Sequence, residues 1–244
     1  MAAPEHLSQI DTLWSIVRRA HGDQSTDAQS AQHNLLDRYS GAARRYLLGA
    51  LRNQDAAEEV FQEFALRFVR GDFRGADAER GRFRNFLKSV LFRLVVDHHR
   101  GRKRQALTNA PEELAPVDVA EPIPTEEAFL ESWRAELLSR AWGALERKQQ
   151  ETGKPYFAVL RYRVDHPALR SSELAERLGE ALGRSISAGN MRTLLHRARE
   201  MFAELLLEEV LHSLERPALA DLEEELADLR LLDYCRPALA RFRR

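Results

Sequence analysis

Residues 95–104 read "VVDHHRGRKR" and hold the side chains of this chain that are most suited to chemistry. The carboxylate of Asp97 and the imidazoles of His98 and His99 are groups that bind metal ions in phosphoesterases. The four cations that follow would instead bind the phosphates of a nucleic acid. The stretch therefore raises two alternative functions, metal-dependent hydrolysis and nucleic-acid binding.

The spacing of the surrounding residues predicts that this stretch is helical, which argues against a metal site. Apolar residues recur on one helix face over residues 83–95, and His98 continues that face. Three consecutive helical residues point about 100° apart, so Asp97, His98 and His99 would need ligands from other elements to hold one ion. Asp97 is instead spaced to pair with Arg93 or Arg100 on the same helix.

The rest of the sequence offers no catalytic motif. It contains no HExxH or CxxC spacing, no GxxxxGK[ST] or GxGxxG phosphate loop, and no Ser or Cys in a nucleophile motif. We therefore expect no catalytic residue, no metal ion and no cofactor. A metal-dependent phosphoesterase that uses Asp97, His98 and His99 remains a remote alternative.

The composition predicts an all-α protein. Hydrophobic residues make up 44 % of the 244 residues, which is enough to bury a sizeable core, and only 9 prolines and 12 glycines interrupt the chain. Ala, Leu, Glu and Arg dominate, and all of them favour helices. The length suits two ordinary domains or one large one.

Three further features predict a cytoplasmic protein without a membrane partner. The lone Cys235 cannot form an internal disulfide, which fits a reducing compartment. No apolar run approaches the ~18 residues of a membrane span. The first residues lack the basic and apolar blocks of a signal peptide.

The formal net charge of −1 conceals strong segregation of charge along the chain. Residues 80–104 carry nine Lys and Arg against one acid, whereas residues 105–136 carry eight acids and one base. Because a partner responds to local charge, the first of these stretches is a candidate surface for nucleic acid.

Helical spacing predicts three helices in the first 70 residues. They cover residues 12–20, residues 28–52 and a third segment that opens at Asp55, where Asp55 as N-cap and Glu58 would form a capping box. The expected buried stripe of the third helix is Ala57, Val60, Phe61, Phe64 and Phe68. A second, largely acidic stripe is a solvated surface or a docking face, and it consists of Glu59, Gln62, Glu63 and Leu66.

A loop, a helix and a linker follow. Three glycines predict a loop over residues 71–81, and the long helix then covers residues 82–103. Its Phe92 falls beside the buried stripe, where an aromatic ring among cations suits single-stranded bases. Residues 105–125 contain four prolines and several acids, which predicts a linker and the boundary between two domains.

The second half of the chain is also expected to be helical, over residues 126–151 and 156–164. A short helix capped by serine is expected over residues 172–182, followed by a turn over residues 183–187 and a long helix from Ala188. This order is typical of a helix-turn-helix, although most helix pairs bind no DNA. Residues 217–244 form an acidic helical tail.

The chain resembles a bacterial sigma factor of the extracytoplasmic-function (ECF) group, in the sigma-70 family. The segment "DAAEEVFQEFALRF" (55–68) resembles the region 2 helix that docks on core RNA polymerase, and "GRFRNFLKSVLFRLVVDHHRGRKR" (81–104) resembles the helix that melts and reads the promoter −10 element. The segments "SSELAERLG" and "ISAGNMRTLLHRAREMFAELL" resemble region 4, which reads the −35 element. The C-terminal extension suggests a longer ECF type.

The resemblance implies a two-domain, all-α transcription initiation factor. Its domains would be residues 1–104 (region 2) and 126–212 (region 4), joined by the acidic linker 105–125 and followed by a helical C-terminal extension, 213–244. Its partners would be promoter DNA and the clamp coiled coil and flap of core RNA polymerase; an anti-sigma factor or a regulatory kinase is left open as a further partner. The alternative is a stand-alone helix-turn-helix regulator that binds duplex DNA without polymerase.

The resemblance also implies three sets of site residues. The polymerase-binding set is the acidic stripe Glu59, Gln62, Glu63 and Leu66. The −10 set is Arg74, Arg80, Arg82, Arg84, Asn85, Lys88, Phe92, Arg93, His99, Arg100, Arg102, Lys103 and Arg104. The −35 set is Arg184, Ser187, Asn190, Arg192, Thr193, His196 and Arg197.

Overall fold

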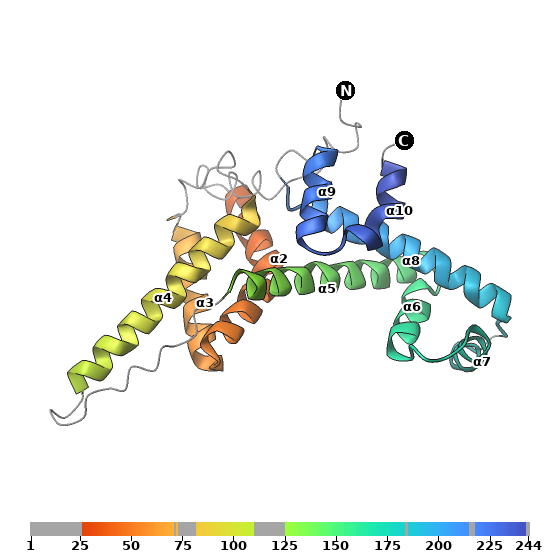
Figure 1. Ribbon diagram of the computed structural model, residues 1–244, viewed down its shortest axis with the longest axis horizontal. Coiled ribbons are helices and arrows are strands. Elements are labelled where there is room, and N and C mark those ends of the chain that lie inside the picture. The colour runs from red at the N-terminus through yellow and green to blue at the C-terminus, as the bar shows by residue number, and fades with distance from the viewer. Residues whose placement is uncertain are drawn as a thin grey trace. The chain divides into compact units, whose positions relative to one another are not determined.

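The computed structural model describes residues 26–70, 72, 82–109, 125–183, 185–214 and 218–242 (Figure 1). These residues form nine helices and no strand, which confirms the all-α prediction. The expected helix over residues 12–20 and nearly all of the expected loop lie outside the described residues. The helices are α2 (Thr26–Leu51), α3 (Gln54–Arg70), α4 (Phe83–Asn109), α5 (Glu126–Thr152), α6 (Tyr156–Asp165), α7 (Ser171–Ala181), α8 (Ala188–Leu211), α9 (Leu219–Asp228) and α10 (Leu232–Phe242).

The chain divides into two compact units. Unit 1 contains Met1–Glu136 and His212–Asp221, and unit 2 contains Leu137–Leu211 and Leu222–Arg244. Helix α5 therefore contributes its first residues to unit 1 and the rest to unit 2. The division into domains at residues 104 and 126 stays a prediction.

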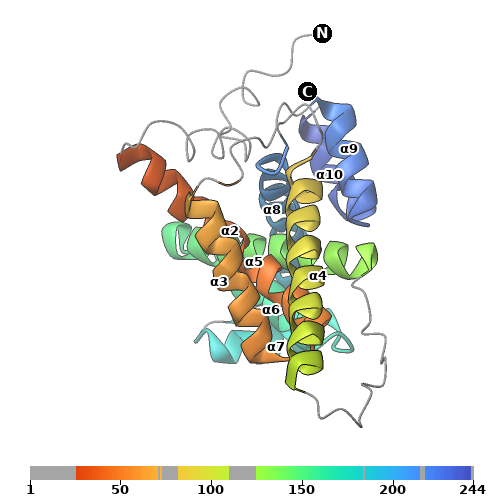
Figure 2. The same cartoon turned by 90° about the vertical axis from the view of Figure 1, so that its left-hand side faces the viewer.

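Unit 1 is built on α2, α3 and α4, which lie against one another (Figure 2). The five residues predicted as the buried stripe of α3 are all buried. On α4, Phe83, Leu87, Leu91 and Val95 are buried at helical spacing, as the periodicity predicted. Removing such apolar faces from water is the main force that holds three amphipathic helices together.

The start of α5 completes the core of unit 1 with two aromatic residues. The ring of Trp133 stacks on Tyr39 of α2 at a centroid distance of 4.8 Å and lies 6.5 Å from Phe83 of α4. The ring of Phe129 meets Tyr46 edge-on at 5.3 Å. Both side chains are almost fully buried, at 1 % exposure for Phe129 and 0 % for Trp133.

The N-terminus of α3 differs from the prediction. The N-cap is Asn53, whose Oδ1 accepts a hydrogen bond of 2.8 Å from the backbone N–H of Ala56. Asp55 lies inside the first turn, and Glu58 is not part of a capping box with it. Glu58 instead accepts two hydrogen bonds from Arg44 of α2, at 3.0 and 3.1 Å, which hold the pKa of this carboxyl below its usual range. Glu58 therefore forms an ion pair between α2 and α3 and not the predicted cap within α3.

Helix α4 continues past the predicted end at Lys103 as far as Asn109. Residues 104–109 contain neither proline nor glycine, so nothing in them stops the helix before Pro111. The predicted linker therefore begins with helical residues, and residues 110–124 lie outside the described part of the chain.

Unit 2 is organised around α8. The first half of α8 packs against α6 and α7 through a cluster that includes Val159, Leu174, Leu178, Met191 and Leu195. Helix α10 lies against α8, where Arg241 forms ion pairs with Glu200 at 3.3 Å and Glu204 at 3.1 Å. Within residues 213–244, the described part thus contains the helices α9 and α10.

The cap of α7 is also not the predicted serine. The N-cap residue is Arg170, and its backbone N–H donates a hydrogen bond of 2.7 Å to the side chain of Glu173. Ser171 and Ser172 lie inside the helix. Glu173 in the first turn thus satisfies the backbone N–H of the N-cap residue itself, as the acidic member of a capping box does.

Candidate functional site

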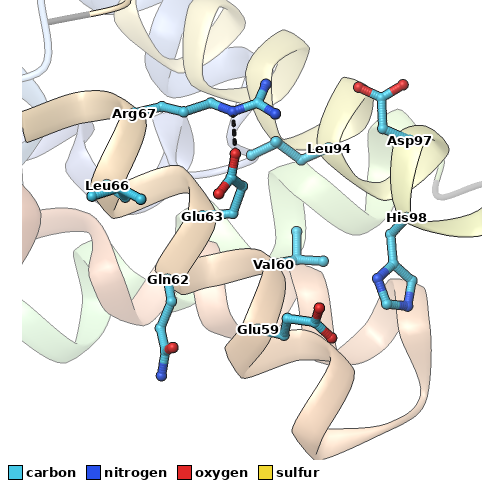
Figure 3. A pocket seen from close by; sticks show the side chains of 9 residues that line it. All are labelled: Glu59, Val60, Gln62, Glu63, Leu66, Arg67, Leu94, Asp97 and His98. Carbon is cyan, nitrogen blue, oxygen red and sulfur yellow. Dashed lines mark hydrogen bonds and ion pairs between the residues drawn. The ribbon is translucent and has the colours of Figure 1, made fainter. Parts of the chain in front are cut away.

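A groove of about 450 Å³ lies between α3 and α4 (Figure 3). All four residues of the predicted polymerase-binding stripe line it. Three residues of α4 that were not predicted as part of this site line it as well. The helix spacing of α4 carried a signal for Leu94 and His98, because its apolar face continues through both, but not for Asp97. The lining residues are Glu59, Val60, Gln62, Glu63, Leu66, Arg67, Leu94, Asp97 and His98.

The groove combines an acidic rim with apolar side chains. Glu59 and Gln62 are exposed, and Leu66 is 44 % exposed. Glu63 accepts a hydrogen bond of 2.6 Å from Arg67 one turn later, as Figure 3 shows. This ion pair fixes the orientation of Glu63. Of the two glutamates, Glu59 is therefore the more accessible to a binding partner. Exposed apolar surface rimmed by charge is typical of a protein-binding site.

Asp97, His98 and His99 do not converge. His98 faces the groove toward α3, and its Nε2 is buried without a hydrogen-bond partner among the described residues (Figure 3). Asp97 is 3.9 Å from Arg100, which confirms one of the two predicted pairings. Burial, the neighbouring His98 and the charge of Arg102 hold the pKa of His99 below its usual value. Within the described residues no group of three His, Cys, Asp or Glu could hold a metal ion.

The predicted −10 residues are not equivalent to one another. Arg84 is 5 % exposed and so does not belong to the surface that nucleic acid could reach. Its position next to Phe83 in the first turn places it in the packed part of the unit. Arg82 and His99 are half-buried, and Arg74 and Arg80 lie outside the described residues. The exposed members are Asn85, Phe92, Arg93, Arg100, Arg102, Lys103 and Arg104.

A second pocket, of about 400 Å³, lies on this part of α4. Phe92 contributes a ring that is 36 % exposed, and Lys88 donates a hydrogen bond of 2.5 Å to Glu126 of α5. Burial raises the pKa of Tyr46 to about 12, so its phenol stays neutral at any physiological pH. The pocket is lined by Tyr46, Lys88, Ser89, Phe92, Arg93, Thr125 and Glu126.

Helix α7 and the long helix α8 pack against each other and are joined by residues 182–187, of which all but Arg184 are described. Gly183 in the turn has a φ of +65°, a conformation that favours glycine. Ser187 caps α8 by accepting a hydrogen bond of 3.2 Å from the backbone N–H of Asn190. The residues of α8 that were predicted to contact the −35 element are all exposed, and they are Asn190, Arg192, Thr193, His196 and Arg197. Arg184 lies outside the described residues.

Residues 35–105 match the protein family described as Sigma-70 region 2. The match covers less than half of the chain, and it includes all of α3, most of α2 and α4, and every residue that lines the groove between α3 and α4. It supports a sigma-factor-like role in RNA polymerase binding and promoter recognition. The comparison with curated proteins gave no match, and neither did the comparison with solved structures.

Over the described ranges, no helix is both long and apolar enough to cross a bilayer.

Proposed function

We propose that this protein is an ECF-type sigma factor that binds core RNA polymerase in the cytoplasm and directs it to promoters with −10 and −35 elements. The observation that carries the proposal is the region 2 match over residues 35–105, together with the acidic groove inside it. A sigma factor needs a surface for the polymerase and a separate surface for DNA. Helix α4 carries both in this chain, with the groove on its contact with α3 and cations on its exposed face.

The groove between α3 and α4 is the proposed docking site for the clamp coiled coil of the polymerase. Glu59, Gln62 and Leu66 offer an acidic, a polar and an apolar contact within two helical turns, and all three are exposed. This arrangement suits a partner helix with basic and apolar side chains, because opposite charge speeds association and apolar contact supplies affinity.

The exposed face of α4 is the proposed surface for the −10 strand. Arg93 and Arg100 would bind phosphates, and the ring of Phe92 would stack against a base. Arg84 is left out of this proposal because it is buried. In the second unit, Arg192 and Asn190 would read base edges of the −35 element, and the neighbouring polar residues of α8 would contact phosphates.

The alternative is a regulator that binds duplex DNA through α7 and α8 without polymerase. The exposed reading residues at the start of α8 support DNA binding under either function. An anti-sigma factor or a regulatory kinase would be a further partner of the sigma factor, and α10 packed on α8 is a candidate place for such control.

The polymerase assignment is tested with the double variant Glu59→Lys/Gln62→Ala. We expect affinity for core RNA polymerase to fall about tenfold or more, since central interface contacts carry most of the binding energy. The matched control is Glu176→Lys, which makes the same charge change at an exposed residue of α7. Binding measured by fluorescence anisotropy that is equal in the two variants would refute the docking site.

A further inference from the structure

Residues 126–136, the first part of α5, belong to unit 1 and lie on α2 and α4 (Figure 1). We call them the return segment. Three contacts hold it there in addition to its buried aromatic rings. Glu126 accepts the 2.5 Å hydrogen bond from Lys88 of α4, Glu136 accepts one of 2.5 Å from Arg45 of α2, and the carboxylate of Glu136 lies against Gly41.

The surface of α2 is shaped for this segment. The carboxylate of Glu136 occupies the space that a Cβ atom at position 41 would need, so a larger residue there would displace this carboxylate. Glu136 is 8 % exposed, and a carboxylate so deeply buried is stable only when it is paired, as it is with Arg45. Glu126 alone could be explained by the preference of a helix N-terminus for acids, but Glu136 lies far inside α5 and cannot.

The return segment meets the face of α4 that is proposed to bind the −10 strand. Thr125 and Glu126 line the same pocket as Lys88, Phe92 and Arg93. The hydrogen bond to Glu126 uses one of the three N–H donors of Lys88, and the carboxylate places negative charge beside the position that a phosphate would take. A phosphate at Lys88 would lie against the carboxylate of Glu126, and the two negative charges would repel each other.

We propose that the return segment competes with single-stranded nucleic acid for the Lys88, Phe92 and Arg93 face of α4, so that this face binds a strand only after the start of the segment moves away. This inference rests on the proposed function, because it concerns the regulation of the −10 surface. Because the two events are coupled, any change that weakens the contact of the return segment with α2 and α4 strengthens strand binding. Strand binding in turn weakens that contact by the same free energy.

The first test compares Glu126→Ala with the unmodified full-length chain. The probe is a fluorescein-labelled single-stranded DNA of mixed sequence, followed by anisotropy. Removing Glu126 frees Lys88, and we expect binding about twofold to fivefold tighter, the range that an exposed ion pair supports. The matched control is Glu131→Ala, which removes the same charge from an exposed position of the same segment. An equal gain in both variants would mean that only net charge matters and would overturn the inference.

The second test follows the segment itself by hydrogen exchange. Adding the same oligonucleotide to the unmodified chain should speed exchange of the backbone amides of residues 126–136. Gly41→Ala, which acts from α2 and removes no cation, should speed exchange of those amides without DNA and tighten DNA binding. Exchange that is unchanged or slowed by DNA would overturn the inference. If no chain binds single-stranded DNA, the proposed function fails with it, whereas binding without competition removes the inference alone.

Discussion

Helices α4 and α8 are the two long helices that we propose bind DNA, and they differ in what their cations already contact. On α4, Lys88 is bonded to Glu126 and Arg84 is buried. On α8, Arg192 and Arg197 are exposed, and neither forms an ion pair with any residue that the structure describes. The number of cations on a helix is therefore a poor guide to its nucleic-acid surface, because the rest of the chain decides which of them a phosphate can reach.

The two helices also differ in how their assignment is supported. The match to Sigma-70 region 2 ends at residue 105 and so includes most of α4 but none of α8. For α8 the support is geometric: a capped start, a glycine turn before it and a row of exposed polar side chains. Experiments that treat the helices in parallel test whether both bind DNA.

The largest expected effect concerns the buried side of each helix. Leu91 of α4 and Met191 of α8 are 0 % exposed, and replacing either with Ala should cost about 2–5 kcal/mol of unfolding free energy because it leaves a cavity. The variants should act on different units. Hydrogen exchange should show lost protection in unit 1 for Leu91→Ala and in unit 2 for Met191→Ala. Equal loss in both units from either variant would show that the units do not fold separately.

The next effect concerns the free cations of α8. Arg192→Ala should weaken binding of a duplex that carries a −35 element by about 1–3 kcal/mol, the range for an arginine that reads a base edge. Arg147→Ala, at an exposed position of α5, is the matched control and should change affinity little. Equal losses in an anisotropy titration would mean that Arg192 contributes only to the general charge.

A smaller effect is expected for the paired cation of α4. Lys88→Ala should weaken binding of single-stranded DNA by only about 0.2–1 kcal/mol, because Lys88 gives up its bond to Glu126 before it binds a phosphate. In a salt titration, the slope of the logarithm of affinity against the logarithm of salt concentration should fall by less than the amount for one full phosphate contact. A loss as large as that of Arg192→Ala would mean that Glu126 does not compete.

The smallest effect is on the pH dependence of stability. The pKa of His99 is lowered in the folded chain by burial and by nearby His98 and Arg102. The unfolded state therefore takes up the proton first, so stability present above about pH 6.5, the unperturbed value, is lost as the pH falls through the lower folded value. His99→Gln should flatten this dependence in urea unfolding between pH 7 and 5. An unchanged slope would show that His99 titrates alike in both states.

The periodic parts of the fold could be predicted from the sequence. The buried stripe of α3 and the apolar face of α4 follow from residues three and four apart, because burial of one face dominates the energy of an amphipathic helix. The acidic stripe on α3 was visible for the same reason. Helices α5 to α8 also begin within one residue of their predicted starts, whereas the predicted helical tail is divided into α9 and α10.

Features that depend on distant residues could not be predicted in this way. The caps at Asn53 and Arg170 were missed because several neighbouring side chains can satisfy a helix terminus, and packing selects one. The burial of Arg84 and the position of residues 126–136 depend on contacts between segments far apart in the sequence. A glycine inside a helix is unfavourable, so Gly41 itself indicated a close contact at that position. The residue that makes this contact, Glu136, is 95 residues away in the sequence and could not be identified from it.

The central claim is that this chain directs core RNA polymerase to promoters. Run-off transcription with purified core polymerase and a library of promoter templates tests it most directly. We predict transcripts from a subset of templates that share −10 and −35 elements, and loss of these transcripts with Glu59→Lys/Gln62→Ala but not with Glu176→Lys. No stimulation of core polymerase on any template, with duplex DNA still bound by the chain alone, would contradict the claim and support the stand-alone regulator.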